Sequence, residues 1–223
     1  MSNKTYLELA KEQLTSPLDY ILNSAKRLQI TNCKETINAI GEEIKIEIDN
    51  INFQINNISY LEQIDHSKLE LKRNSVDFDR LINKVLDDIL HLTKIRQIKI
   101  EIDSHKSNEF SSDLKMLYTI LVNLIANAIE FSYNNTTIHV VLFEGHDNFK
   151  FIVKNDGRGI KNEISNKIFD KFYQSNDRVI RIQKTQGLGL FVIKNLVDFL
   201  QGSIEFDSKE NGTTIFEITL PKL

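Results

Sequence analysis

The sequence of 223 residues contains a single cysteine, two prolines and no tryptophan. The lone Cys33 excludes an internal disulfide and any metal site built from several cysteine ligands. Basic residues are in slight deficit, with 28 lysines and arginines against 31 aspartates and glutamates and a formal net charge of −3. This balance argues against a nucleic-acid partner held on a basic surface.

Long apolar runs are also lacking, since none approaches the roughly 18 residues that a helix needs to cross a bilayer. The first residues, MSNKTYLELAKEQ, do not form a signal peptide. We therefore expect no membrane segment in this chain. We also expect a cytoplasmic location, either for the chain itself or as the cytoplasmic part of something longer.

Prolines and glycines are scarce before Gly145, which predicts long helices first and a mixed region later. Apolar residues recur every three or four positions from Tyr6 to about Gln29, in a pattern that Pro17 should kink. A second stripe, rich in isoleucine, runs from about residue 35 to 63. The short link between the stripes predicts an antiparallel hairpin. Pairing with a second copy as a four-helix bundle would bury both stripes, and packing onto the rest of the chain is the alternative.

The remainder of the chain predicts a mixed sheet with helices on one face. We therefore assign an α+β fold, a long helical hairpin followed by an α/β sandwich, with domains at residues 1–73 and 74–223. The expected helices are 76–92, 113–131 (capped by Ser112 or Asp113), 164–172 and one opening at Gly189; the expected strands are 97–102, 137–143, 149–153, 203–206 and 214–220.

Two glycines, Gly187 and Gly189, stand directly before the last of these helices in the stretch QGLGLF. Glycine at the start of a helix lets backbone N–H groups approach an anion closely, and the helix dipole favours negative charge there. The pattern is typical of a phosphate-binding turn. By itself it is weak evidence, because a glycine pair before a helix is more often an ordinary tight turn.

Asn123 and Asn127 lie four residues apart, and so on one face of an otherwise apolar helix. Because asparagine is a poor helix former, the presence of two aligned asparagines in this helix needs an explanation. One interpretation is a buried hydrogen bond to a neighbouring loop. The other is that the amide oxygens face Mg²⁺ and phosphate oxygens, which suits a hard cation that keeps part of its water.

The stretch Asn155–Ile160 leaves a strand and turns tightly at Gly157 and Gly159. It fits a plain hairpin turn, or a side-chain oxygen that accepts a hydrogen bond from an adenine amino group. Gly212-Thr213 is a further turn near the C-terminus.

Together these stretches resemble the ATP-binding domain of sensor histidine kinases. LVNLIANAIEFS (121–132), KNDGRGI (154–160), IFDKFY (168–173), QGLGL (186–190) and NGTTIFEITLP (211–221) are similar, in order and at ordinary spacing, to that family's N, G1, F, G2 and G3 boxes. NISYLEQIDHSKLEL (57–71) and SVDFDRLI (75–82) resemble the end of the family's dimerisation hairpin and its link to the ATPase domain.

The resemblance implies ATP and Mg²⁺ as cofactors, with Asn127 coordinating Mg²⁺, Asn123 beside the phosphates and Asn155 reading adenine. A mobile lid would span roughly residues 174–186. The implied partners are a second copy or another histidine kinase, together with the receiver domain of a response regulator, for a cytoplasmic chain or the cytoplasmic part of a longer sensor. The other implied nucleotide-site residues are Gly157, Gly159, Ile160, Phe169, Phe172, Tyr173, Gly187, Leu188, Gly189, Leu190 and Thr213.

The first helix departs from the family at its phosphoacceptor box. Where the family has His-Glu-Leu-Arg-Thr-Pro, this chain has Glu-Gln-Leu-Thr-Ser-Pro, with Glu12 at the acceptor position and no histidine in the helix. A carboxylate would give a labile acyl phosphate instead of a phosphohistidine. We therefore expect a kinase core that binds ATP–Mg²⁺ and dimerises but does not autophosphorylate at the usual site.

Alternatives remain at this stage. The chain could use Glu12 itself or a partner's histidine as acceptor, or act as a response-regulator phosphatase or docking module, with Gln13 and Ser16 orienting water. Gyrase-type or chaperone-type ATP hydrolysis is disfavoured, because Asn123 stands where those proteins have a catalytic glutamate.

Three smaller departures concern the nucleotide site. Glu130 replaces a usual basic residue and should weaken nucleotide binding if it points inward. Asn155 replaces the commoner aspartate and can donate as well as accept, so discrimination against guanine could relax. Thr185 replaces a frequent glycine before the G2 turn and could stiffen the lid.

Overall fold

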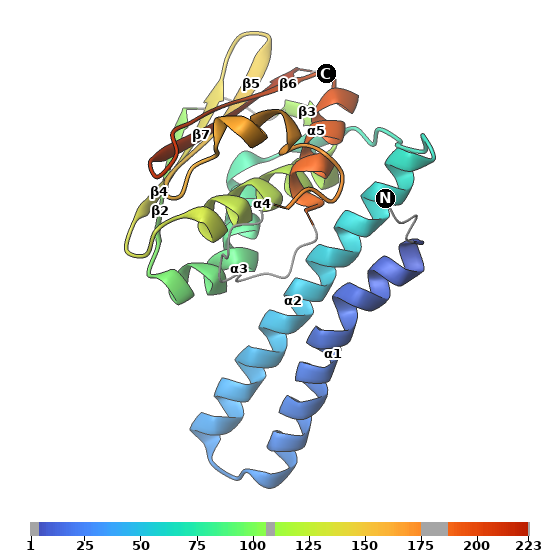
Figure 1. Cartoon of the computed structure of the whole chain (residues 1–223), viewed down its shortest axis with the longest axis vertical. Coiled ribbons are helices and arrows are strands. Elements are labelled where there is room, and N and C mark those ends of the chain that lie inside the picture. Colours follow the sequence, from blue (N-terminus) through green and yellow to red (C-terminus); the bar gives the residue numbers. More distant parts are fainter. Residues whose placement is uncertain (1–4, 106–109, 175–186, 223) are drawn as a thin grey trace. The chain divides into compact units, whose positions relative to one another are not determined.

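The computed structural model describes residues 5–105, 110–174 and 187–222 and divides into two compact units (Figure 1). The first is a helical hairpin that ends at Ser67, and the second begins at Lys68. The domain boundary after residue 73 that the sequence indicates stays a prediction. The predicted fold class, a helical segment followed by an α/β sandwich, is confirmed.

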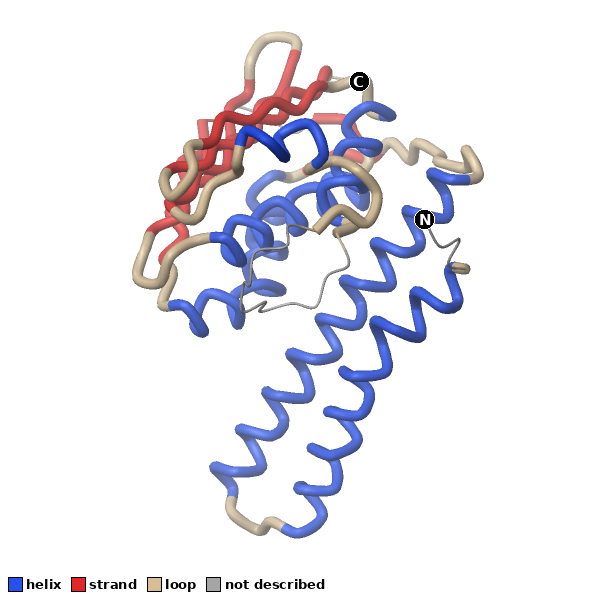
Figure 2. Tube along the Cα trace, viewed as in Figure 1, coloured by secondary structure: helices blue, strands red, loops and turns tan. Residues whose placement is uncertain are grey.

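The hairpin consists of α1 (Tyr6–Ile30) and α2 (Lys34–Asp65) (Figure 2). Thr5 starts α1 with a capping box, because its Oγ1 accepts from Glu8 N at 3.2 Å and Glu8 Oε2 accepts from Thr5 N at 2.8 Å. The two helices are tied at opposite ends of the hairpin. Tyr6 Oη donates to Asp65 Oδ2 at 2.9 Å, and an ion pair joins Arg27 to Glu43 at 2.8 Å.

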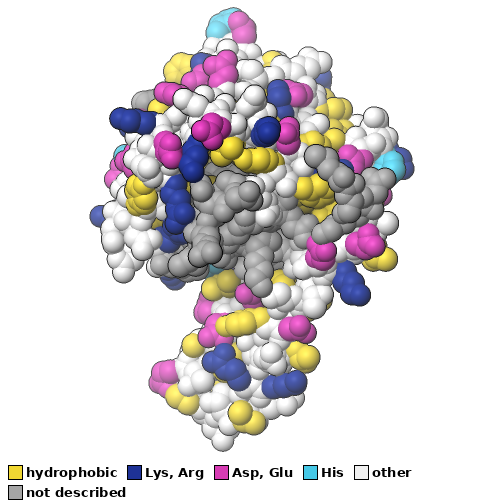
Figure 3. All heavy atoms as spheres, in the orientation of Figure 1, with side chains coloured by type: hydrophobic (Ala, Val, Ile, Leu, Met, Phe, Trp, Pro, Cys, Tyr) yellow, Lys and Arg dark blue, Asp and Glu magenta, His cyan; other side chains and the backbone are white. Residues whose placement is uncertain are grey.

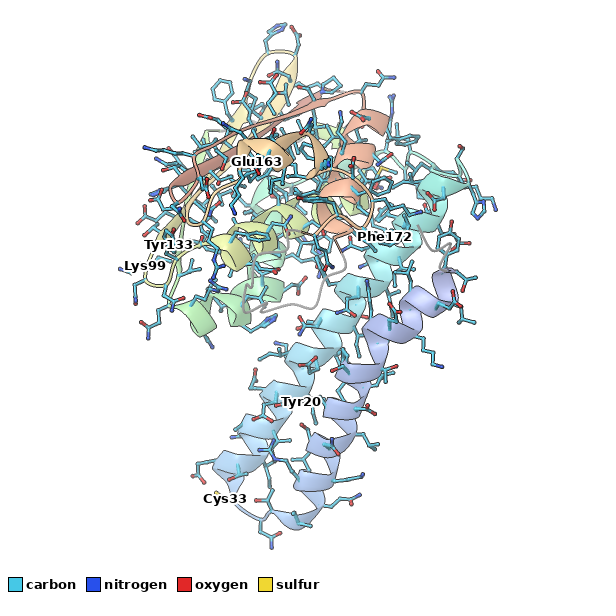
Figure 4. The ribbon with its side chains drawn as sticks, viewed as in Figure 1. Tyr20, Cys33, Lys99, Tyr133, Glu163 and Phe172 are labelled. Atoms are coloured by element: carbon cyan, nitrogen blue, oxygen red, sulfur yellow. The ribbon has the colours of Figure 1, made fainter. Side chains whose placement is uncertain are left out.

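Pro17 lies inside α1, in the first helix that the sequence predicts. Tyr20 lies along the hairpin, and the exposed Cys33 lies at the turn that joins its two helices (Figure 4). The thiol of Cys33 donates to Glu35 Oε2 at 3.0 Å. This bond lowers the pKa of the exposed Glu35 carboxyl.

A five-stranded sheet organises the second unit, in which β2 (Lys99–His105) and β4 (Thr137–Glu144) are parallel and the other neighbouring strands are antiparallel. Helices α3 (Phe78–Arg96), α4 (Leu114–Phe131) and α5 (Gly189–Phe199) lie on one face of this sheet (Figures 1 and 2). The strand order is β2 (Lys99–His105), β4 (Thr137–Glu144), β5 (Asn148–Asp156), β7 (Thr213–Pro221) and β6 (Ser203–Ser208).

Alternation sets which face of each strand is buried, because successive side chains point to opposite sides of a sheet. On β5 the buried residues are every second one up to Asn155, and on β7 they run from Thr214 to Leu220. Phe78 of α3 packs on this face against Phe149 and Phe151, with ring centroids 5.5 Å apart in both pairs.

Two features differ from the sequence-based expectation. The short strands β1 (Asn74–Val76) and β3 (Phe110–Ser112) pair in a separate two-stranded sheet that no periodicity predicted. The helix expected at residues 164–172 is a single 3₁₀ segment, η1 (Asn162–Lys167). Both are too short for a repeating apolar pattern to reveal them.

Most residues of the core helix α4 are apolar, and most of them are buried. Its 18 residues are long and apolar enough, by length and composition alone, to cross a membrane, and 72% of that window is buried inside the protein. The expectation that no segment approaches this length and composition is therefore wrong for α4. Its burial reflects packing between the sheet, α3 and α5.

Asp113 caps α4 and ties it to the start of the second unit. Its Oδ1 accepts from Lys115 N and Met116 N, both at 3.0 Å, and its Oδ2 accepts from Lys72 N at 2.8 Å. Because Asp113 is buried, replacing it with alanine leaves three N–H groups without this acceptor.

We expect Asp113→Ala to lower the free energy of unfolding by about 2 kcal/mol, and Asp113→Asn to lower it by about 1 kcal/mol or less, because an amide oxygen still caps the helix. Urea unfolding followed by circular dichroism measures both. Equal losses for the two variants would contradict a capping role.

Candidate functional site

The start of α5 lies directly against the two asparagines of α4. A Cβ added at Gly189 would lie 2.8 Å from Asn123 Oδ1 and 3.6 Å from Asn127 Nδ2. Glycine leaves this approach open, whereas a larger residue would require the Asn123 side chain to shift. The sequence pattern that singled out the glycine pair and the pattern that singled out the asparagine pair therefore belong to one place in the fold.

The asparagines differ in freedom. Asn123 is buried, and its Nδ2 donates to Thr119 O at 2.8 Å, which turns its Oδ1 toward Gly189. Asn127, one turn further along α4, is half-buried. The amide oxygen of Asn123 is thus held in one orientation beside Gly189. The amide of Asn127 stays partly exposed, so a ligand can reach it.

Leu188 is the N-cap of α5 and makes no side-chain cap bond. The helix begins with Val192 N donating to Leu188 O at 2.8 Å, so the amides that precede Val192 point out of the helix start. The Leu188 side chain is buried, and Leu190 is half-buried. Backbone N–H groups at this end can therefore receive an anion next to the two asparagine side chains.

The turn that follows β5 is bonded to the end of α4. Arg158 N donates to Phe131 O at 3.2 Å, and Gly157 N donates to Gly212 O at 3.0 Å. A Cβ at Gly157 would lie 2.0 Å from Phe131 O, and one at Gly159 would lie 2.0 Å from Lys209 O. Gly159 also has φ of +68°, which side chains disfavour. The two glycines are required by close backbone approach.

Tyr133, just after α4 (Figure 4), forms two further hydrogen bonds near this turn. Its N donates to Asp156 O at 3.0 Å, and its hydroxyl donates to Asn211 Oδ1 at 3.2 Å. Because Phe131 lies four residues after Asn127, the α-helix separates this turn from the asparagines by a rise of about 6 Å. α4 therefore fixes the distance between the two parts of the site.

Sheet register decides which polar residues share the buried face. Asn155 pairs with Thr214, and both are buried. Asp156 pairs with Thr213 on the opposite face, where Thr213 Oγ1 donates to Asp156 Oδ1 at 2.6 Å. Sequence reasoning named Thr213 and missed Thr214. The apolar alternation of Phe216, Ile218 and Leu220 was the signal that would have found it.

The two ends of the predicted lid lie together. A Cβ at Gly187, where φ is +71°, would lie 2.1 Å from Tyr173 O. Phe172 has a φ of 63°, unusual for a residue with a side chain, and is partly exposed (Figure 4). Phe169 packs edge-on against Phe206 with ring centroids 6.0 Å apart. The predicted lid itself, apart from Gln174, lies outside the described residues.

Glu130 is buried, and its charge acts on the guanidinium of Arg96. Burial lowers the pKa of the Arg96 guanidinium, the charge of Glu130 raises it, and Arg158 lowers it. Arg96 Nη1 also donates to Ser132 O at 2.8 Å. The negative charge that the sequence flagged is thus accompanied by positive charge at the end of α4, and it is not an isolated repulsive group.

In α1, Glu12 and Ser16 are exposed, whereas Gln13 is only 6% exposed. Among the described residues no three histidine, cysteine, aspartate or glutamate side chains are grouped as a metal site. Acidic and basic side chains are interspersed on the face that Figure 3 presents.

Comparison with known proteins gives a consistent picture. The family model described as histidine kinase-, DNA gyrase B-, and HSP90-like ATPase matches residues 112–223. The chain is 24% identical over 220 residues to the heme sensor protein HssS of Staphylococcus aureus, covering 97% of this chain and 46% of that protein. It therefore spans about half the length of this relative.

Solved structures share the fold. Full-length ShkA in complex with AMPPNP has a TM-score of 0.68 at 20% identity, covering 97% of this chain and 45% of ShkA. The histidine kinase ThkA in complex with the response regulator protein TrrA has a TM-score of 0.59 at 21% identity, covering 95% of this chain and 59% of that one.

Proposed function

Because this chain belongs to the histidine kinase-, DNA gyrase B- and HSP90-like ATPase family, we propose that its second unit binds ATP with Mg²⁺ as part of a two-component sensor kinase core. The contact between Gly189 and the two asparagines carries this proposal. It brings outward-pointing amides of a helix start and amide oxygens of a second helix to one place, which suits a polyphosphate accompanied by a hard cation.

Each group has a distinct task in this proposal. Amides at the start of α5 bind phosphate oxygens, with Gly187 and Gly189 keeping the approach open. Asn127 offers its oxygen to Mg²⁺, and Asn123, held by Thr119, lines the phosphates. Asn155 reads the base on the buried face of the sheet. When bound, ATP–Mg²⁺ would supply an activated phosphoryl group.

Equilibrium titration of the full chain with ATP, with and without Mg²⁺, tests this function. We expect saturable binding of one nucleotide per chain that weakens when EDTA removes Mg²⁺. A chain that is folded by circular dichroism and binds no nucleotide in either condition would overturn the proposal.

We further propose that the chain does not autophosphorylate at the usual position. Glu12 is exposed, and a phosphorylated carboxylate is an acyl phosphate that hydrolyses readily, unlike the base-stable phosphoramidate of histidine. Such a core would act by conformation, by pairing with a competent kinase, or by docking a response regulator.

Incubation with γ-labelled ATP and Mg²⁺ should therefore leave no acid-labile, base-stable label on the wild-type chain. The variant Glu12→His should acquire such label on a minor fraction of chains, because the exposed position then carries a nitrogen nucleophile. Glu12→Gln is the matched control and should stay unlabelled. Base-stable label on the wild type would sink this part of the proposal.

We also propose that the hairpin associates with a second copy or with another histidine kinase. Apolar side chains stand exposed along both of its helices, where water would otherwise contact them (Figure 3). A four-helix bundle would cover them. The exposed set comprises Leu7, Leu18, Tyr20, Leu22, Ile30, Ile37, Ile48 and Ile55.

The burial of Gln13 bears on the alternative function. A side chain that orients water toward a partner's phosphoryl group has to reach solvent, and Gln13 is only 6% exposed. Docking of a response-regulator receiver domain on the bundle is therefore favoured over phosphatase action through Gln13.

A further inference from the structure

We propose that the base-reading end of this site accepts six-oxo purine nucleotides, such as inosine triphosphate, as well as the six-amino purine of ATP. The inference rests on the proposed nucleotide-binding function and concerns the groups that would face the six-position of the base. It follows from which side chains the sheet register brings to the buried face at the end of β5.

Asn155 is the last buried residue of β5 and is only 4% exposed. Its side chain is an amide, which presents one donor group and one acceptor oxygen and can exchange them by turning about its terminal bond. A carboxylate at this position can only accept hydrogen bonds. It would pair with a six-amino group and repel a six-oxo oxygen, whereas an amide pairs with either.

The neighbouring carboxylate cannot restore that selection. Asp156 lies on the opposite face of the sheet, is exposed, and accepts the hydroxyl of Thr213 at 2.6 Å. Asp156 could face the core only if the pairing register of β5 shifted by one residue. Such a shift would turn every core side chain of β5 outward. The Asp156 carboxylate, which can only accept hydrogen bonds, therefore lies on the face of the sheet opposite to the proposed base site.

The groups beside Asn155 are equally reversible. Thr214, directly opposite Asn155, shares a 2.7 Å hydrogen bond with Ser208 in which either hydroxyl can be the donor. Ser208 Oγ also accepts from Ile160 N at 2.9 Å, which fixes the pair to the turn after β5. Each of these side chains can donate or accept. None of the side chains of Asn155, Thr214 and Ser208 is therefore restricted to accepting hydrogen bonds.

The size of the effect follows from what an unpaired buried group costs. A site built to satisfy one hydrogen-bonding pattern rejects a ligand lacking it by about 10⁴-fold, because buried polar groups are then left unpaired. A cluster that can reverse its donors and acceptors leaves no group unpaired with either purine. We therefore expect the dissociation constants for the two nucleotides to differ by less than about tenfold.

The test compares ATP with inosine triphosphate, which differs only at the six-position and in the proton on the adjoining ring nitrogen. Calorimetric titration of the full chain with Mg²⁺ measures the ratio of the two dissociation constants. We expect a wild-type ratio below about ten, and a ratio raised at least about tenfold in Asn155→Asp. Asp156→Asn, the matched change on the opposite face, should leave the ratio as in wild type.

A wild-type ratio of ten or more in favour of ATP would overturn the inference while leaving the proposed ATP binding intact. This outcome is measured on the wild-type chain alone and does not depend on whether a variant folds. An unchanged ratio in a folded Asn155→Asp would overturn it as well. Binding of neither nucleotide would instead overturn the proposed function, and the inference with it.

Discussion

Replacing Asn127 with alanine should weaken binding of ATP–Mg²⁺ by about 100-fold, the loss expected when a hard cation loses an oxygen ligand and its surroundings loosen. Stability should change by less than about 1 kcal/mol, because Asn127 is half-buried and alanine is the better helix former. Calorimetric titration and thermal unfolding of the same preparation separate the two effects.

Asn195 provides the matched control. It is also a half-buried helical asparagine, and its Nδ2 donates to Phe191 O at 2.9 Å, well along α5 from the helix start. Asn195→Ala should bind nucleotide as the wild type does. If Asn127→Ala also binds as the wild type does, the magnesium role given to Asn127 is wrong, whatever else binds the phosphates.

Gly157→Ala should lower the free energy of unfolding by about 3 kcal/mol or more, at or above the upper end of what overpacking usually costs. The added Cβ would lie 2.0 Å from Phe131 O, with the next contacts at Phe131 C and Ser132 Cα. All three are backbone atoms, so no side chain can swing aside. Gly157 N is also bonded to Gly212 O, which holds the strand from its other side.

Gly212→Ala is the control on the other side of that hydrogen bond. A Cβ there would lie 3.4 Å from its nearest atoms, which is ordinary contact. Urea unfolding should show Gly212→Ala within about 1 kcal/mol of the wild type. A shared midpoint for the wild type and Gly157→Ala would show that the turn and the end of α4 can separate without loss, contrary to their hydrogen bonding.

Many residues of the candidate site could be identified from the sequence alone. Asn123 and Asn127 could be placed on one helical face from their spacing alone, and Asp113 could be named as a cap from its position before an apolar run. Gly187 and Gly189 stood out because glycine at the start of a helix lets backbone N–H groups approach an anion closely, although an ordinary tight turn explains the same pair. These are local signals, and a helix or strand expresses them through its own period.

Other parts depended on residues that are distant in the chain. The sequence showed Glu130 only as a negative charge in place of a usual basic residue, and the fold brings it close enough to Arg96 to raise the pKa of that guanidinium. Thr213 and Thr214 are adjacent in sequence, and only the pairing of β5 with β7 shows that Thr214 shares a face with Asn155. Short elements such as β1 and β3 carry too few residues to display a period.

The sequence by itself determined the types of the longer helices and strands, the helical hairpin, the α/β sandwich and the chemical groups available to a nucleotide. The tertiary structure alone decided how closely the end of α4 approaches the backbone at Gly157, how closely the asparagine side chains approach Gly189, and which of two neighbouring polar residues faces the core. The physical reason is that periodicity is encoded within each element. Strand register and close approach arise only when separate elements pack together.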